Sequence, residues 1–264
     1  MRFPNTAGTG TLWTVRGTMP LYPTMFCQFV VICCDNGDPL ANELVCNCLG
    51  SLRSACTYAC QLLEASFCLL CDGTACAAES VALVLCQLNG RRSQYHGGVI
   101  HRNGLLQVPL PNWLSVLAMR MHRETSAFGG TPPNHVLVNA YMPGQGILAH
   151  EDGPVYHPGV CILSLGASTV LNFWRKEAPG GSRSLDPEMS VLLMPRSLLV
   201  FLDDAYADCL HGIDEVVEDR LDPSICNLAV CGMETGMRLP RVGERVSLTV
   251  RRVKRVQRNL IKLA

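Results

Sequence analysis

Short apolar runs separated by glycine and proline turns dominate this chain from about residue 86 onward. The runs are rich in Val, Leu, Ile and Phe and have the length of β-strands. Strands at regular intervals, with turn residues between them, predict a β-sandwich or barrel rather than alternating βαβ units. The predicted strands are residues 135–142, 159–165, 169–174, 190–194, 197–202 and 242–253.

One segment has helical rather than strand periodicity. Apolar residues recur at spacings of three and four within residues 113–123, at Trp113, Leu114, Leu117 and Met121. This pattern predicts an amphipathic helix. A less regular helical pattern covers residues 40–70, and we base no function on it. Residues 177–188 and 213–234 are rich in Pro, Gly, Ser or acidic side chains, so both are predicted to be loops.

The composition is that of a folded protein, because 48% of the residues are hydrophobic and 17% are charged. Eleven of the 15 cysteines lie between Cys27 and Cys86 at irregular gaps. This spacing does not fit a secreted disulfide scaffold and indicates a reducing compartment. Only Cys68 and Cys71 form a CxxC pair, without the second pair that a zinc site needs. We therefore expect these cysteines to act as small buried hydrophobic side chains.

Residues 1–85 contain no lysine and differ in texture from the rest of the chain. We treat them as an uncertain Cys-rich N-terminal segment, disordered or mis-predicted. It is either a divergent N-terminus or the product of a wrongly assigned reading-frame start, and the composition favours the second. The folded domain is assigned to residues 86–264. The longest apolar run, residues 21–34, is too short to span a bilayer, so we expect no membrane partner.

The formal net charge is zero, with 22 basic and 22 acidic residues, but the charges are unevenly placed. Residues 201–222 contain eight acids and one base, whereas residues 238–264 contain nine bases and one acid. A basic C-terminal end can bind nucleic-acid phosphates, and it can equally be a solvated face or a weak nuclear-targeting patch. The charge pattern by itself therefore selects no partner.

Three residues are candidate metal ligands. His150 and Asp152 point the same way from an extended chain and can occupy two adjacent positions on one metal, although most H-x-D pairs have no such role. His211 is the third candidate, and Gly212 after it would let the backbone approach a bound group. Two histidines and one carboxylate leave three positions open, as in non-haem Fe(II) oxygenases, whereas a closed zinc site needs a fourth ligand. His157 is predicted to be a loop residue at an entrance.

A strictly alternating strand follows near the C-terminus. Its polar face carries Arg245, Ser247, Thr249 and Arg251. In an antiparallel sheet this face is most often solvated. If it points into a barrel, the buried guanidiniums need an anion, and a small dicarboxylate would suit them. Asn139 and Tyr141 point together from another strand and could bond the same acid from the opposite wall.

The order N-x-Y, H-x-D, His and R-x-S-x-T-x-R resembles the AlkB family of Fe(II)- and 2-oxoglutarate-dependent dioxygenases. More narrowly, the subgroup of AlkB homologue 6 is similar in the segments CQLNGRRSQYHGG, NHVLVNAYMPGQGILAHEDGP, PRSLLV, LHGI and RVSLTVRRVKRV. The resemblance runs from about Cys86 to Leu260, which is roughly two-thirds of the chain. The combination of motifs is highly specific.

This resemblance implies a double-stranded β-helix, or jelly-roll, with flanking helices and a dioxygenase domain over residues 86–264. It implies Fe(2+) as cofactor, and 2-oxoglutarate and O2 as co-substrates. The implied catalytic iron ligands are His150, Asp152 and His211. The implied 2-oxoglutarate contacts are Asn139, Tyr141, Arg245, Ser247, Thr249 and Arg251.

The resemblance also implies oxidative demethylation of alkylated RNA or DNA through a ferryl intermediate, with release of succinate, carbon dioxide and formaldehyde. Two alternatives stay open, a protein or small-molecule hydroxylase with the same iron centre and a nucleic-acid-binding protein with little turnover. Tyr156, Phe173 and Trp174 could stack on a flipped base, although strand aromatics are more often core. We expect a monomer in the cytoplasm and nucleus.

Overall fold

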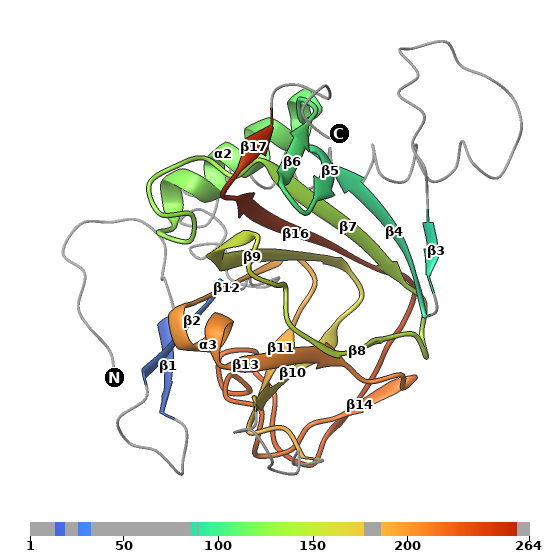
Figure 1. The fold of residues 1–264 in the computed structure, drawn as a ribbon. Helices are drawn as coiled ribbons and strands as arrows, with labels where there is room; N and C mark the ends of the chain where they lie inside the picture. The colour runs from blue at the N-terminus through green and yellow to red at the C-terminus, as the bar shows by residue number, and fades with distance from the viewer. Residues whose placement is uncertain (1–13, 19–25, 33–85, 89, 177–185, 258–264) are drawn as a thin grey trace, which may run out of the picture.

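Two antiparallel β-sheets lie face to face in this protein (Figure 1). The computed structural model describes residues 14–18, 26–32, 86–88, 90–176 and 186–257. The large sheet has eight strands, in the spatial order β1 (Thr14–Thr18), β2 (Phe26–Ile32), β12 (Ser197–Leu202), β9 (Tyr156–Gly166), β16 (Arg245–Val253), β7 (His135–Tyr141), β4 (Arg91–His96) and β3 (Cys86–Leu88). The small sheet has four, in the order β11 (Met189–Leu193), β10 (Thr169–Arg175), β13 (Cys209–Ile213) and β8 (Ile147–His150). This arrangement confirms the predicted mainly β, jelly-roll fold.

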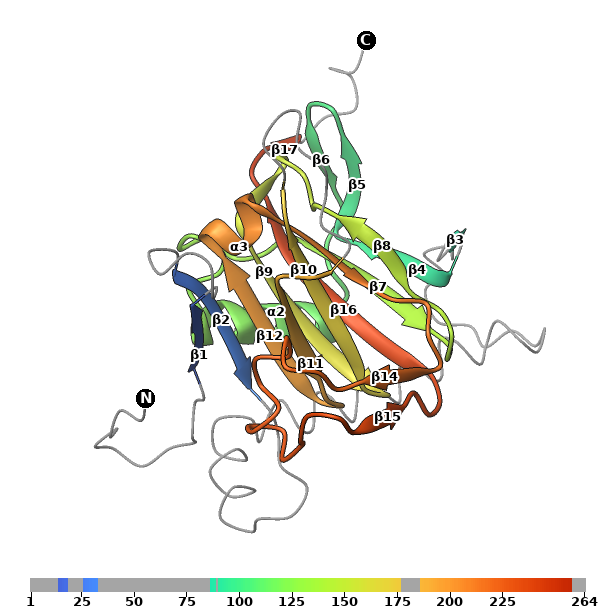
Figure 2. The same cartoon turned by 90° about the horizontal axis from the view of Figure 1, so that it is seen from below.

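Two smaller sheets lie at opposite ends of the molecule (Figures 1 and 2). One end carries a three-stranded sheet made of β17 (Val256–Gln257), β6 (Gly104–Gln107) and β5 (Gly98–His101). The other end carries the pair β14 (Glu218–Arg220) and β15 (Arg238–Pro240). A short helix, α3 (Asp203–Ala207), connects β12 to β13 and so joins the large sheet to the small one.

The helix α2 (Asn112–Glu124) covers the outer face of the large sheet. Its buried side chains follow helical spacing and form one apolar stripe, Leu114, Leu117, Ala118 and Met121. At its C-terminal end the Thr125 hydroxyl donates to the carbonyl of Met121 over 2.8 Å. The stripe packs on alternate residues of the large sheet, Val136, Val138, Cys161, Leu163, Leu248 and Val250.

The packing of α2 decides which residues of β7 and β16 face inward. Successive side chains of a strand point to opposite faces, so when Val138 and Leu248 face the helix, their neighbours face the small sheet. The inward set of β7 then includes Asn139 and Tyr141. The inward set of β16 is the polar face that the sequence singled out, Arg245, Ser247, Thr249 and Arg251.

A second hydrophobic cluster joins the inner faces of the two sheets. Phe201 of β12 and Phe173 of β10 meet edge to face across the gap, with ring centroids 5.5 Å apart. Val160 and Ile162 contribute from β9, and Val191 from β11. The cluster closes the interior on this side, and a cavity remains next to β7, β16 and β8.

Most of the predicted elements agree with the structure. The strand predicted over residues 197–202 coincides with β12, and the predicted helix lies within α2. The strand predicted over residues 242–253 begins only at Arg245, because Gly243 before it has a positive φ of 79°. The predicted loop at 213–234 was wrong in part, since it contains β14.

The sequence did not predict the strands β4, β5 and β6, which have too few apolar residues for a clear pattern. It also assigned no strand to residues 1–85, from which β1 and β2 come, and β2 pairs with β12 in the large sheet. The helical pattern at residues 40–70 and the CxxC pair lie outside the described residues. None of the helices in the described part of the chain is long and apolar enough to cross a membrane.

The packing of α2 can be tested with two neighbouring residues. Leu117 is 1% exposed and Val116 is 55% exposed. We expect Leu117→Ala to lower the free energy of unfolding by about 2–5 kcal/mol, because it leaves a cavity against the large sheet. The control Val116→Ala should change it by less than about 0.5 kcal/mol. Urea unfolding followed by circular dichroism measures both, and equal effects would contradict this orientation of the helix.

Candidate metal centre and co-substrate pocket

The three predicted metal ligands come together at one end of β8. His211 of β13 pairs directly with His150 of β8, and their ring centroids are 4.4 Å apart. Asp152 follows two residues after the end of β8. One ligand atom from each of the three lies within 4.8 Å of the others. Within the described ranges this is the one cluster of three such side chains, and it has no fourth member to close a zinc site.

Gly212 allows the two strands that carry the histidines to approach closely. A Cβ placed on Gly212 would lie 2.9 Å from both the carbonyl oxygen of Ile147 and the backbone nitrogen of Ala149. The expectation that this glycine makes room for a bound group was therefore wrong. The residue makes room for β8, which brings His150 beside His211.

Asp152 is held by a buried ion pair with Arg251. Nη1 of Arg251 donates to Oδ1 of Asp152, and the two side chains are 6% and 4% exposed. The ring of Tyr156 lies against the same guanidinium, 4.3 Å from its central carbon. The second carboxylate oxygen, Oδ2, is buried and has no hydrogen-bond partner in the described structure. An oxygen in that state is suited to bind a metal ion.

Each of the two histidines has a feature that suits a metal ligand. Nδ1 of His150 donates to the carbonyl oxygen of Leu148 over 2.9 Å, which leaves Nε2 as the nitrogen with a free lone pair. Burial is the largest cause that lowers the pKa of His211 from 6.5 to about 4, the Asp152 carboxylate opposes this shift, and the neighbouring His150 and Arg251 add to it. The imidazole of His211 is therefore uncharged at neutral pH. Two neutral imidazoles and one carboxylate form the donor set that non-haem Fe(II) oxygenases use.

Arg245 lies deep in the pocket and lacks an anionic partner. It is 4% exposed, and its Nη2 donates to the hydroxyl of Ser164 over 2.9 Å. Its Nε and Nη1 are buried without a partner in the described structure. Burial lowers the pKa of Arg245 to about 10. The solvated alternative for this strand face is thus excluded, and a buried guanidinium with unpaired Nε and Nη1 is suited to an anion such as a carboxylate.

Asn139 and Tyr141 lie on the same wall as Arg245, so the prediction of an opposite wall was wrong. β7 pairs with β16, which puts Tyr141 beside Arg245 and Asn139 beside Ser247. The central carbon of the Arg245 guanidinium is 5.5 Å from the Tyr141 ring centroid. Oδ1 of Asn139 accepts from the Ser93 hydroxyl over 2.7 Å, so its amide nitrogen is the end that can donate to a ligand.

These residues share one cavity of about 500 Å³. Its wall includes all three predicted ligands and all six predicted co-substrate residues, together with Arg91, Tyr95, Leu148, Tyr156, Ile162 and Glu215. Of the aromatic candidates only Tyr156 lies in the wall, while Phe173 and Trp174 are buried elsewhere. His157 is a residue of β9 that packs against Gly129 and is not in the wall, so its prediction as an entrance loop residue was wrong.

Several pocket residues were not found from the sequence. Ser164 becomes the partner of Arg245 only because β9 and β7 flank β16, with Ser164 and Asn139 both opposite Ser247. Arg91 and Tyr95 reach the pocket through the pairing of β4 with β7. The only sign of these two residues in the sequence was the polar segment before Gly97, and that segment does not show which side chains reach the pocket until its pairing with β7 is known.

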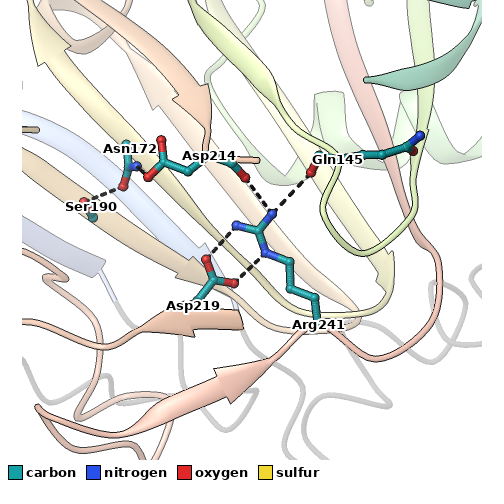
Figure 3. Close-up of polar contacts among 6 residues, drawn as sticks. All are labelled: Gln145, Asn172, Ser190, Asp214, Asp219 and Arg241. Atoms are coloured by element: carbon teal, nitrogen blue, oxygen red, sulfur yellow. Dashed lines mark hydrogen bonds and ion pairs between the residues drawn. The ribbon is translucent and has the colours of Figure 1, made fainter. Parts of the chain in front are cut away.

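A buried polar network ties together the segments that hold the site (Figure 3). Arg241 forms a bidentate ion pair with Asp219, at 2.8 and 2.6 Å. Its Nη1 also donates to the backbone carbonyls of Asp214 and Gln145. These contacts join the turn before β8, the residue after β13, the strand β14 and the segment between β15 and β16. The network continues from the Asp214 carboxylate to Asn172 of β10.

Comparisons with known proteins agree with this chemistry. The sequence profile of the 2OG-Fe(II) oxygenase superfamily matches residues 72–251. The chain is similar to "Probable RNA/DNA demethylase ALKBH6" of Danio rerio, with 41% identity over 177 residues, covering 65% of this chain and 75% of that protein. It is also similar to "Uncharacterized protein L905" of Acanthamoeba polyphaga mimivirus, with 29% identity over 172 residues, covering 62% of this chain and 70% of that protein.

One solved structure, "The structure of OsALKBH1", aligns with 85% of this chain and 96% of its own, at 13% identity and a TM-score of 0.42.

The buried network predicts a large difference between two neighbouring arginines. Arg241 is 6% exposed in its pair with Asp219, whereas Arg238 is 71% exposed in its pair with Glu218. We expect Arg241→Met to lower the free energy of unfolding by about 3–5 kcal/mol, because Asp219 keeps a buried charge. Arg238→Met should lower it by less than about 1 kcal/mol. Chemical unfolding of both variants measures the difference, and similar losses would contradict the network's role.

Burial of His135 predicts acid sensitivity. Burial, followed by the charge of Arg251, lowers the pKa of His135 from 6.5 to about 3. Between these values the unfolded chain binds a proton at this residue and the folded chain does not, so stability falls as the pH drops. We expect His135→Phe to reduce the pH dependence of the unfolding free energy by about 1.4 kcal/mol per pH unit. Urea unfolding of the metal-free protein between the two pKa values measures this pH dependence. An unchanged slope would refute His135 as a source of the acid sensitivity.

Proposed function

The chain belongs to the 2OG-Fe(II) oxygenase superfamily and, within it, to the AlkB family, and on that premise we propose that it removes methyl groups from alkylated RNA or DNA by oxidation. It is an Fe(II)- and 2-oxoglutarate-dependent dioxygenase, with O2 as the second co-substrate. The observation that supports the proposal most is the combination within one cavity of three convergent metal-binding side chains and a buried, incompletely paired arginine.

We assign the metal to His150, Asp152 and His211. The chemistry that Fe(II) supplies when bound is activation of O2 for oxidation of a C–H bond, while 2-oxoglutarate becomes succinate and carbon dioxide. The protein's part is to position these ligands and to keep their donor atoms available. The backbone carbonyl of Leu148 sets the tautomer of His150, and burial keeps His211 neutral. Arg251 holds one oxygen of Asp152 and leaves the other available.

We assign the distal carboxylate of 2-oxoglutarate to Arg245. Nη2 keeps a second N–H beside the one that Ser164 accepts, and together with the unpaired Nε or Nη1 it can donate to both carboxylate oxygens. The contact with Ser164 also holds the plane of the guanidinium. Tyr141 lies beside Arg245, and its hydroxyl can donate to the same co-substrate. Ser247 and Thr249, between the two arginines on β16, and Asn139 complete the polar wall along which the co-substrate lies.

The nucleic-acid substrate rests on the likeness to the relative of Danio rerio, which is described as a probable RNA/DNA demethylase. The cavity supports it, because its volume exceeds what a small dicarboxylate fills and Tyr95 and Tyr156 in its wall can contact a base. An N-methyl group oxidised next to the metal leaves as formaldehyde. A monomeric state and a cytoplasmic and nuclear location stay predictions.

The proposal is tested by product analysis with N-methylated and unmethylated oligonucleotides of the same sequence. We expect formaldehyde and succinate in equal amounts with the methylated strand. Arg245→Met should raise the KM for 2-oxoglutarate at least about 30-fold, because a buried charge-assisted contact worth about 2 kcal/mol is lost. Arg238→Met, which changes an exposed arginine outside the cavity, is the matched control and should leave this KM unchanged.

Other outcomes would replace the proposal. Succinate release stimulated by peptides or metabolites, and not by methylated oligonucleotides, would identify a protein or small-molecule hydroxylase. Oligonucleotide binding without turnover, with Fe(II) and 2-oxoglutarate present, would identify a binding protein. An Arg245→Met variant with the KM of the parent protein would refute the co-substrate assignment.

A further inference from the structure

The turn between β5 and β6 and the turn between β16 and β17 lie at one end of the molecule (Figure 2). Together they carry three exposed cationic side chains. Arg102 stands in the turn between β5 and β6, and Lys254 and Arg255 stand in the turn between β16 and β17. We call these three residues the basic corner. None of them belongs to the cavity wall or takes part in the reaction as derived above.

Backbone contacts hold the two turns of the basic corner against each other. The backbone N–H of Leu105 donates to the carbonyl of Arg255 over 2.8 Å, and the side chain of Gln257 donates to the carbonyl of Asn103 over 2.8 Å. A Cβ added to Gly104 would lie 2.8 Å from the Cβ of Arg255, so the turns touch at this glycine. The three charges are therefore carried by a fixed part of the backbone.

The basic corner has no carboxylate to neutralise it nearby in the sequence. Residues 90–123 and 245–257, which supply the corner and its flanks, contain no Asp or Glu. Within the described ranges, none of the three cations forms a salt bridge. Three like charges held together without a counter-charge favour binding of an anion with several negative groups.

The basic residues between Arg251 and Arg255, at the end of β16 and just after it, fall into two groups. Arg251 points inward to Asp152, and Arg252 donates to the backbone carbonyl of Phe128. Only Lys254 and Arg255 extend into solvent from this run, and Arg102 joins them from a segment distant in sequence. The surface charge thus lies at the basic corner and not along the whole strand.

The basic corner is connected directly to the metal centre. The backbone N–H of Lys254 donates to the carbonyl of Val155, three residues after the ligand Asp152. Tyr156, which lies in the cavity wall, packs with Leu105 and Val253 in the hydrophobic cluster beneath the corner. Tyr156 thus links the cavity wall to the residues next to the corner, and the corner is on this account placed to meet the phosphates of a strand with one base in the cavity.

We propose that the basic corner binds the phosphate backbone of single-stranded nucleic acid next to the nucleotide in the cavity. The proposal rests on the proposed function and locates its substrate on this surface. Arg102 and Arg255 can each form bidentate hydrogen bonds with a phosphate, and Lys254 adds a point charge. Such contacts position a strand without reading its sequence, so the corner sets affinity and register rather than base preference.

The test measures binding of a fluorescein-labelled oligouridylate to the full chain by anisotropy at several salt concentrations. The variant carries Arg102→Glu, Lys254→Glu and Arg255→Glu, and the control is Arg220→Glu, an exposed arginine of β14 at the opposite end (Figure 1). Because each phosphate contact contributes about −0.7 to the slope of log affinity against log salt, the triple variant should lose about 2 from that slope. The control should keep the slope of the parent protein.

Lys254→Glu alone should lose about 0.7 from the slope, which keeps the test valid if the triple variant does not fold. Folding is checked by the thermal shift on adding Fe(II) and 2-oxoglutarate without oxygen. An unchanged slope in the variants, or an equal loss in the control, would overturn the proposal. So would binding of phosphatidylserine vesicles without binding of the oligonucleotide. If the methylated oligonucleotide is not demethylated but the salt slope of binding still depends on the basic corner, only the proposed function is refuted.

Discussion

Arg245 and Arg251 are buried between the two sheets, on the inner face of β16, and much of the interior is arranged around their charges. Taking a guanidinium out of water costs several kcal/mol unless an opposite charge and hydrogen-bond acceptors replace the water. Arg251 has such a partner in Asp152, whereas Arg245 has one serine hydroxyl and two N–H groups that no described residue meets. A dicarboxylate supplies what Arg245 lacks. The proposed co-substrate contact and the stability of this interior therefore both involve the charge of Arg245.

The inward orientation of the two arginines depends on α2 on the other side of the sheet. Leu248 and Val250 of β16 pack under that helix, and the pleat of the strand then turns the polar residues inward. Across the cavity, the close approach at Gly212 aligns the two histidines, and the Arg241 network holds the turns on either side. The two histidines of the metal centre thus receive their positions from strand register and backbone packing, whereas Asp152 stands in the segment after β8 and is held by Arg251.

Periodicity in the sequence predicted the elements whose apolar pattern is strong, such as β12 and α2, and the facing sheets that follow from them. It did not predict β4 to β6, because their side chains are mixed in character and their strands form by pairing with β7 or with one another. The strict alternation of β16 was visible, but periodicity alone favoured a solvated polar face over one that points into the interior. Burial of the opposite face under α2 decided between them.

The sequence by itself determined the chemistry of the candidate site, because ligand type and spacing in H-x-D, His and R-x-S-x-T-x-R are local properties of the chain. The tertiary structure decided which residues the side chains of the site contact. Tyr141 and Asn139 lie beside Arg245 and Ser247 and not across from them. Ser164, on a third strand, accepts a hydrogen bond from Arg245, and Gly212 contacts β8. None of this follows from the sequence, because strand order and register depend on contacts between residues far apart in the chain. The same holds for the surface charge, which is assembled from two turns about 150 residues apart whose backbones hydrogen-bond.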